Sequence, residues 1–156
     1  MLRLRYVRPS SDHSGAGGGP GDDVLFVSRP DVPVVPVDPG LPPFFAHSWF
    51  LGGDDGRDVL IGGASPDLFE GGAGNDVLIA RDGNPERVAC GDGFDIAYAD
   101  PEDALFNCEI TLSLPLARVA RLRDALGRVS NARTASSGAL SARAQSTLRQ
   151  FVRATK

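Results

Sequence analysis

The sequence predicts an all-β fold made of stacked turn-and-strand repeats. A nine-residue pattern of glycines, one aspartate and apolar residues runs through three contiguous units, residues 53–61, 62–70 and 71–79. The unit ends, such as Val-Leu-Ile at 77–79, are the β-branched and apolar residues that favour short strands. Nineteen glycines and twelve prolines in 156 residues argue against long helices in this part of the chain.

The unit "GGAGNDVLI" (71–79) is the best-formed copy, and "GGASPDLFE" and "GDDGRDVLI" precede it. Related copies stand upstream at 18–26, "GGPGDDVLF", and downstream at 90–98, "CGDGFDIAY". Between them, "ARDGNPERVA" (80–89) is a degenerate, ten-residue copy. The nine-residue units share an aspartate at the sixth position and, in the well-formed copies, an apolar residue at the eighth, and the ten-residue copy has Glu86 near the aspartate position. The sixth-position aspartates are Asp23, Asp58, Asp67, Asp76 and Asp95.

Each unit divides into a turn half and a strand half. Glycine reaches positive φ, so the turn half can bend sharply and point carbonyl oxygens inward. In the strand half alternate side chains face opposite ways, so the middle one faces the core. A glycine-rich loop could also cradle a phosphate, but "GAGND" lacks the lysine, the long preceding strand and the following helix of a nucleotide loop. The recurrence instead favours a cation site.

These units resemble the glycine- and aspartate-rich nonapeptide GGxGxDxUx of the RTX (hemolysin-type) calcium-binding repeats, in a degenerate form similar to secreted actinobacterial proteins. The resemblance covers residues 53–98 well and 18–26 in isolation. It implies a short parallel β-roll, a β-solenoid in which two nonapeptides make one 18-residue coil. Calcium would lie between turns one coil apart, held by sixth-position carboxylates and backbone carbonyls, which suits a hard cation with six to eight oxygen ligands.

The resemblance also implies a ligand set. It pairs the sixth-position acids one coil apart: Asp58 with Asp76, Asp67 with Glu86 or Asp82, and Asp76 with Asp95. The expected metal ligands are Asp58, Asp67, Asp76 and Asp95, with Asp55 and the backbone carbonyls of Gly53, Gly62, Ala64, Gly71 and Ala73. Ser65, Pro66 and Pro85 depart from the pattern, so two or three calcium ions are expected. Asp23 becomes a ligand only if the intervening loop folds its unit back onto the roll.

Cys90 and Cys108 are 18 residues apart, which is one coil of such a roll. Their Cα atoms would then lie about 5 Å apart, within the range of a disulfide, although two free thiols in a reducing cytosol are the alternative. A disulfide and modest calcium sites both favour a secreted, extracellular protein. The N-terminal residues show no recognisable signal peptide, and the absence of an 18-residue apolar run predicts no transmembrane segment.

Charge divides the chain into an acidic and a basic part. Residues 1–112 hold 19 Asp and Glu against 7 Lys and Arg, whereas residues 113–156 hold 9 Lys and Arg and one acid. The expected organisation is a disordered N-terminus (1–17), an isolated repeat with a Pro-rich loop (18–52), the calcium-binding roll (53–112) and a basic helical tail (113–156). Apolar residues spaced by three and four predict an amphipathic helix in that tail: Leu116, Val119, Leu122, Leu126 and Val129.

The tail is interpreted as a basic cap on the acidic roll, with an anionic surface or a protein partner as the alternative. Aromatics are nearly absent from it, so no nucleic acid partner is expected. The end of the Pro-rich loop, "PPFFAHSWF", is interpreted as rings packing over the end of a core, with a ligand platform as the alternative.

No enzyme is expected, because the chain has neither HExxH nor GxSxG and its aspartates recur at the repeat period. Two hypotheses of function remain. The first is a secreted calcium-binding β-roll module whose folding depends on calcium. The second is an accessory or remnant module of an RTX hydrolase or adhesin that binds a surface or glycan ligand.

Overall fold

The computed structural model describes residues 3–7, 15–27, 49–63 and 65–131, and the description below concerns these residues. They form eleven strands and one helix. The elements are β1 (Arg3–Val7), β2 (Gly15–Gly17), β3 (Asp23–Val27), β4 (Phe50–Gly52), β5 (Val59–Ile61), β6 (Leu68–Ala73), β7 (Val77–Ile79), β8 (Arg87–Asp92), β9 (Ile96–Tyr98), β10 (Ala104–Phe106), β11 (Ile110–Leu112) and α1 (Leu116–Asn131).

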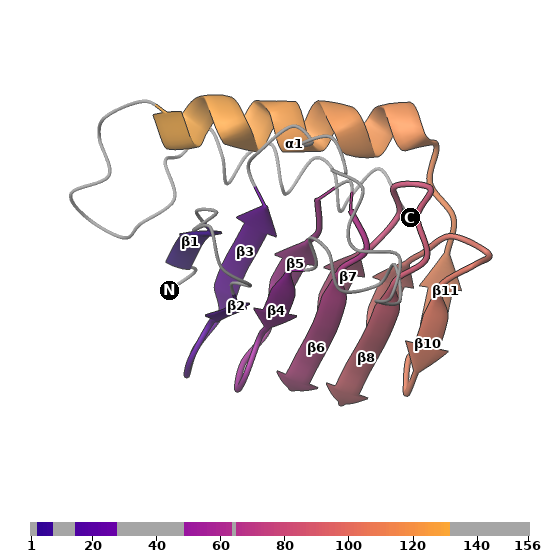
Figure 1. The fold of residues 1–156 in the computed structure, drawn as a ribbon. Coiled ribbons are helices and arrows are strands. Elements are labelled where there is room, and N and C mark those ends of the chain that lie inside the picture. Colours follow the sequence, from indigo (N-terminus) through magenta and orange to yellow (C-terminus); the bar gives the residue numbers. More distant parts are fainter. Residues whose placement is uncertain (1–2, 8–14, 28–48, 64, 132–156) are drawn as a thin grey trace, which may run out of the picture.

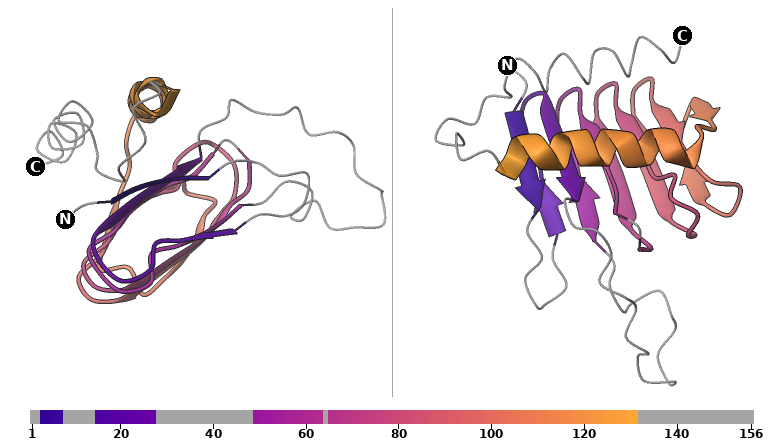
Figure 2. Two further views of the ribbon diagram at one scale, coloured as in Figure 1. Left: turned by 90° about the vertical axis from the view of Figure 1, so that its left-hand side faces the viewer. Right: turned by 90° about the horizontal axis from the view of Figure 1, so that it is seen from above.

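Successive strands alternate between two parallel sheets (Figure 1). The first sheet has the order β1-β3-β5-β7-β9-β11, and the second has the order β10-β8-β6-β4-β2. The two sheets face each other as the long sides of a flattened coil, seen end-on in Figure 2. Strands one coil apart pair residue for residue, as in Leu60 with Leu78. The predicted parallel β-roll architecture is therefore confirmed, with two open sheets.

The unit 18–26, which stands alone in the sequence, is stacked on the roll. Its strand β3 pairs in parallel with β5, and β2 pairs with β4 in the second sheet. The first sheet thus continues from β5 to β3 and β1 across the long Pro-rich segment. Stacking one coil on the next requires that the strands match, whereas the length of the chain between them adds little loop-closure cost.

The first sheet is buried on both faces. Leu60 and Leu78, the middle residues of β5 and β7, point into the roll beside Phe69 of the second sheet. Their neighbours Ile61 and Ile79 face outward and belong to a second core. The middle position of each triplet therefore faces the interior of the roll, as the alternation predicts.

Helix α1 covers this outer core. Val119 and Leu122 are buried against Ile61 and Ile79, and the helix runs across the strands of the first sheet (Figures 1 and 2). Sixteen residues of helix extend about 24 Å, which equals about five interstrand spacings. One helix is therefore long enough to cover the apolar outer face of the whole sheet.

Several expectations about the flanks have mixed outcomes. Disorder over residues 1–17 is not confirmed, since residues 3–7 and 15–17 are strands. The predicted tail helix is present at 116–131, but Leu116 is 46% exposed although it was placed in the apolar stripe. The side chains of Leu126 and Val129, the remainder of the tail and most of the Pro-rich loop lie outside the described residues.

The described helix is too short and too polar to be a candidate for a membrane span. Cys90 and Cys108 form a disulfide, with Cα atoms 5.2 Å apart, as the 18-residue spacing predicts. The bond joins β8 to the segment that follows β10 and closes the last coil. A closed loop of this length contributes about 3 kcal/mol of stability in the loop-entropy description.

Candidate metal sites

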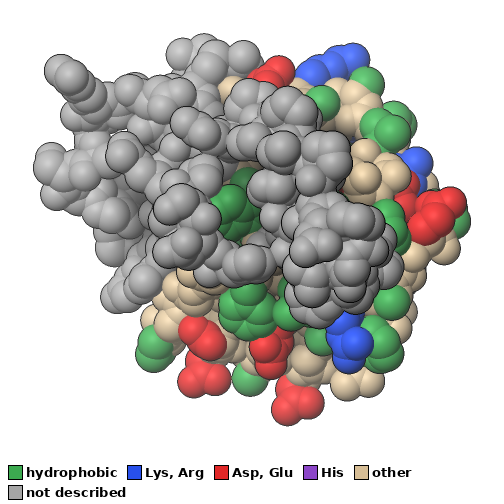
Figure 3. Space-filling model, in the orientation of Figure 1, with side chains coloured by type: hydrophobic (Ala, Val, Ile, Leu, Met, Phe, Trp, Pro, Cys, Tyr) green, Lys and Arg blue, Asp and Glu red, His purple; other side chains and the backbone are tan. Residues whose placement is uncertain are grey.

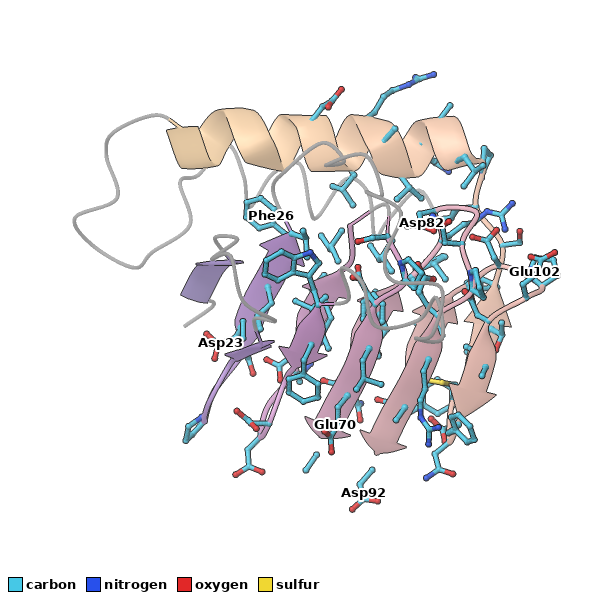
Figure 4. All side chains as sticks on the ribbon, in the orientation of Figure 1. Asp23, Phe26, Glu70, Asp82, Asp92 and Glu102 are labelled. Atoms are coloured by element: carbon cyan, nitrogen blue, oxygen red, sulfur yellow. A yellow bond between two sulfur atoms is a disulfide. The ribbon has the colours of Figure 1, made fainter. Side chains whose placement is uncertain are left out.

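Four sixth-position aspartates lie in a single row along one edge of the roll, where strands of the first sheet begin. We call Asp23, Asp58, Asp76 and Asp95 the aspartate row. All four are buried, with at most 1% of each residue exposed. Figure 4 shows Asp23 and Asp92 on the side of the roll where these turns lie, and acidic side chains gather along the lower margin of Figure 3.

One carboxylate oxygen of Asp58, Asp76 and Asp95 links each of them to the coil before. Oδ1 of Asp58 accepts the backbone N–H of Asp23 at 2.7 Å, and Oδ1 of Asp76 accepts that of Asp58 at 2.8 Å. Oδ1 of Asp95 accepts the N–H of Asp76 at 2.8 Å. Glu109 ends the series, since its Oε2 accepts the N–H of Asp95 at 2.7 Å. These bonds fix the orientation of the carboxylates of Asp58, Asp76 and Asp95.

The other oxygen, Oδ2, is buried in Asp58, Asp76 and Asp95 and has no hydrogen-bond partner among the described residues. It lies beside the first glycine of its own turn. A Cβ added at Gly53 would lie 2.6 Å from Asp58 Oδ2 and closer still to the carbonyl oxygen of Gly71. A Cβ at Gly71 would likewise lie 2.8 Å from Asp76 Oδ2 and closer still to the next first-position carbonyl. Each of these turns therefore has carboxylate and carbonyl oxygens around a space without a side chain.

The fourth position of the turns has to be glycine. Gly74 has φ 145°, a conformation that other residues rarely adopt. A Cβ there would collide with the carbonyl oxygen of Gly56 in the preceding coil. The second position does not require glycine, because Asp54 adopts φ 68° there, where the best-formed unit has glycine. The glycine half of the repeat thus lets the backbones of successive turns approach closely.

The row concentrates negative charge in a buried place. Burial, together with the carboxylates of Asp76 and Asp23 and against the lowering effect of the N–H of Asp23, raises the pKa of Asp58 to about 7. Burial, with the neighbouring Asp95, also raises the pKa of Asp76. The side chains that shift these two pKa values are all aspartates, so none of them supplies a positive charge to offset the ionised carboxylates.

The row fits a hard cation. Its orphaned oxygens are carboxylate oxygens, and carbonyl oxygens stand beside them, which is the ligand chemistry that calcium prefers. Within the described part of the chain, no three His, Cys, Asp or Glu side chains already form a metal-binding group. A cation between two turns would therefore take two carboxylates of the row and complete its shell with backbone oxygens.

Asp67, which the sequence analysis paired with Glu86 or Asp82, is not part of the aspartate row. It lies on the opposite edge of the roll, before β6, and takes the residue before β8, Glu86, as its partner one coil on. Its Oδ1 accepts the N–H of Trp49 at 3.1 Å and its Oδ2 that of Gly63 at 2.6 Å. Both oxygens already have donors, so Asp67 differs from the aspartates of the row.

The predicted carbonyl ligands are distributed in the same way. Those of Gly53 and Gly71 lie at the row, beside the glycine spaces. The carbonyl of Ala73 accepts a hydrogen bond from the coil before at 2.8 Å, and so does the carbonyl of Asp55, another predicted ligand residue, at 2.7 Å, which leaves each a second lone pair. Gly62 lies on the edge of Asp67, and Ala64 is outside the described residues.

The sequence search left two residues of these rows out of the ligand set. Asp23 was expected as a ligand only if the intervening loop folds its unit back, and Glu109, which follows Asp95 by 14 residues rather than 18, was not considered. A signal was present in both cases, since each acid directly precedes a strand triplet rich in apolar residues. Asp103 before β10 has the same signal on the opposite edge.

The fold and these turns define a parallel β-roll with a row of cation-binding geometry. Residues 52–85 match the family model for the RTX calcium-binding nonapeptide repeat, in four copies. The predicted resemblance is thereby confirmed: the chain carries RTX repeats, and calcium is the cation that such repeats bind. No curated protein and no solved structure matches the chain.

Proposed function

We propose that the chain is a secreted calcium-binding module with three calcium positions along the aspartate row. The positions lie between Asp23 and Asp58, between Asp58 and Asp76, and between Asp76 and Asp95. The observation that carries this proposal is the set of buried Oδ2 atoms that lack a partner and lie beside backbone carbonyls. Three positions agree with the two or three ions expected from the sequence.

In Asp58, Asp76 and Asp95 the two carboxylate oxygens have different roles. Oδ1 holds the coil before, through the N–H bonds of 2.7 to 2.8 Å, and Oδ2 is left for the cation. The carbonyls of Gly53, Gly71 and Cys90 stand at the first position of each following turn and would supply further oxygens. Bound calcium supplies the positive charge that offsets repulsion between the buried carboxylates.

Folding of the module depends on calcium for the same reason. Without a cation, the buried aspartates either keep a proton or remain as uncompensated charges, and both reduce the stability of the folded chain at neutral pH. Metal binding then contributes directly to folding free energy. A secreted location suits this design, because extracellular calcium is abundant and the Cys90–Cys108 disulfide persists there.

Calcium titration of the full chain tests the proposal. Isothermal titration calorimetry should report a saturable heat, and circular dichroism should gain β signal as calcium is added. The matched control is the same titration with magnesium, which accepts this irregular oxygen geometry poorly. Absence of heat and of a spectral change up to about 10 mM calcium would contradict the proposal.

An accessory role in binding a surface or glycan ligand is the second candidate. The outer face of the second sheet exposes Phe50, Leu68 and Phe106, at 37%, 37% and 44%. The guanidinium of Arg87 lies 4.7 Å from the centre of the Phe106 ring on this face. Glycan-array binding by the calcium-loaded chain and by F50A and F106A variants tests this role, and equal signals from all three would argue against it.

A further inference from the structure

The disulfide lies next to the last of the proposed calcium positions, between Asp76 and Asp95. Cys90 opens the turn that ends in Asp95, and Cys108 directly precedes Glu109, the residue that ends the aspartate row. The bond joins strand β8 to the coil that follows it (yellow in Figure 4). Both halves of the bond therefore belong to segments that shape this position.

The backbone of Cys90 borders the position directly. A Cβ added at Gly71 would collide with the carbonyl oxygen of Cys90 and would lie 2.8 Å from Asp76 Oδ2. The Cys90 carbonyl and the orphaned oxygen of Asp76 therefore stand around the same space. Displacement of Cys90 would take an oxygen ligand away from the cation.

Cys108 anchors the segment that holds Asp95 from the other side. Oε2 of Glu109 accepts the N–H of Asp95 at 2.7 Å, and the N–H of Ile110 donates to the carbonyl oxygen of Asp95 at 3.1 Å. Asn107, at φ 51° in the left-handed region, turns the chain sharply just before Cys108. The disulfide fixes this corner covalently, and the hydrogen bonds of Glu109 and Ile110 connect it to Asp95.

The two cysteines differ in their access to solvent. Cys90 is fully buried, whereas Cys108 is partly exposed on the last coil. Thiol–disulfide exchange depends on access to the sulfur that is attacked. A thiolate from solvent therefore approaches the bond from the side of Cys108.

We propose that the Cys90–Cys108 disulfide is a redox switch for the last calcium position, which a dithiol opens more readily when calcium is absent. This switch rests on the calcium positions of the proposed function. In the opening reaction a thiolate of the dithiol attacks Sγ of Cys108, and Cys90 leaves as a thiolate and takes up a proton. The second thiolate of the reductant then displaces Cys108, which also takes up a proton, and closes the reductant's own disulfide. Two electrons and two protons pass to the chain.

Calcium and the disulfide stabilise each other through this position. Reduction releases the Cys90 carbonyl and the segment of Glu109 from their fixed places, so the last ion is bound less tightly. The positions between Asp23 and Asp58 and between Asp58 and Asp76 keep their ligands. Because coupling between two sites is reciprocal, calcium lowers the reduction potential of the disulfide by the same free energy. A coupling of about tenfold, ordinary for linked sites, corresponds to about 30 mV for this two-electron couple.

The consequence is a module that responds to two conditions together. Where calcium is abundant and thiols are scarce, as outside cells, the last coil stays closed. Where calcium is scarce and a dithiol is present, the last position and the disulfide are lost together.

Redox titration of the full native chain tests the switch. The chain is equilibrated with reduced and oxidised dithiothreitol, in calcium or in a chelator, and its free thiols are labelled and counted. Calcium should lower the reduction potential by about 30 mV. D95N removes a carboxylate of the last position and should abolish this shift. D23N is the matched control, because it makes the same change at the other end of the row, and it should keep the shift.

Glu109 is tested through the same calcium-dependent shift. E109Q keeps an oxygen that accepts the N–H of Asp95 and should retain the shift, whereas E109A should lose most of it. An undiminished shift in E109A would show that Glu109 does not connect the disulfide to the row, and this result overturns the proposal.

Calorimetric titration of the oxidised native chain separates this proposal from the proposed function. If the chain binds calcium but its reduction potential is the same with and without calcium, the switch is refuted and the calcium module stands. If the oxidised chain binds no calcium, the proposed function fails and the switch fails with it. A shift that D23N abolishes as completely as D95N also overturns the switch, since the coupling would then be to the roll as a whole. Circular dichroism in saturating calcium checks the folding of each variant, and the native chain decides the main result without any substitution.

Discussion

Replacing Asp76 by asparagine should remove two calcium ions, whereas replacing Asp23 should remove one. Asp76 borders two intervals of the aspartate row, and Asp23 stands at its end. Asparagine keeps an oxygen that can accept the N–H of Asp58, now at 2.8 Å, so the link between coils survives. The change converts the orphaned Oδ2 into an amide nitrogen, which cannot bind calcium.

The magnitude follows from mass action. At free calcium about 100-fold above the dissociation constant, each occupied site adds about 2.7 kcal/mol to the free energy of unfolding. D76N should therefore lower stability in calcium by about 5 kcal/mol, and D23N by about half of that. Without calcium D76N should be no less stable than the native chain, because it removes a carboxyl whose pKa burial raises.

Calorimetric titration gives the ion numbers, and urea unfolding with calcium or with a chelator gives the two stabilities. Equal ion loss in D76N and D23N would show that Asp76 is not shared between two sites. A loss of stability in D76N that is the same with and without calcium would show that its role is structural. Either result refutes the reasoning.

Two further predictions concern the turns. Gly74→Ala should lower the free energy of unfolding in calcium by about 3 kcal/mol or more, because the new Cβ clashes with Gly56 and alanine must also adopt φ 145°. Gly83→Ala should show the cost of backbone strain alone, because Gly83 has φ 95° and open space around it. Thermal unfolding of both variants separates the cost of the clash from the cost of the strained backbone. The calcium-free chain should lose stability as pH rises from about 4 to 7. The pKa of Asp58 in the folded chain is raised from 3.8 to about 7. The folded state therefore binds more protons than the unfolded state between these pH values, so its stability falls as pH rises. Urea unfolding at pH 5 and pH 8 measures this trend, which saturating calcium should remove; a rise in calcium-free stability with pH would contradict it.

The period of the sequence predicted the parts of the fold that depend on nearest neighbours. Asp58 and Asp76 are 18 residues apart and Asp76 and Asp95 are 19, so counting, with one inserted residue recognised in the ten-residue unit, was sufficient to pair them. Counting failed where the spacing departs from 18 residues by many residues. Asp23 reaches Asp58 across 35 residues and Asp95 reaches Glu109 across 14. A solenoid requires matched strands in adjacent coils and is tolerant of the chain length between them.

The ligand quality of Asp67 could not be read from its residue type. Its unit has the sixth-position aspartate, yet Ser65 and Pro66 replace residues of the regular turn. In the structure, two backbone N–H groups donate to this carboxylate. Sequence patterns report which group is present, whereas calcium binding depends on which lone pairs remain available after folding.

The three-residue strands of the first sheet indicate in the sequence that a further element covers this sheet. Units of this sheet end in Val-Leu-Phe, Val-Leu-Ile, Val-Leu-Ile and Ile-Ala-Tyr, which are apolar on both faces of a strand. The unit of the second sheet ends in Leu-Phe-Glu, with Phe69 buried and its two neighbours exposed. Apolar flanks therefore indicated a covered face, and the amphipathic segment from Leu116 was available to cover it.

The two ends of the roll differ in how they are held, and this predicts an order of melting. The last coil carries bonds that need no calcium: the Cys90–Cys108 disulfide, the Arg81–Asp100 ion pair and the stacking of Arg87 on Phe106. The coils that contain Asp23 and Asp58 depend on the aspartate row. Hydrogen exchange of the calcium-free chain should therefore show protected amides in β8 and β10 and fast exchange in β3 and β5. A C90S/C108S variant should lose the protection at β8 and β10, because the loop closure worth about 3 kcal/mol is gone. Uniform exchange along the roll in the native chain would mean that calcium and the disulfide stabilise one cooperative unit, and the proposed division between the two ends would then be wrong.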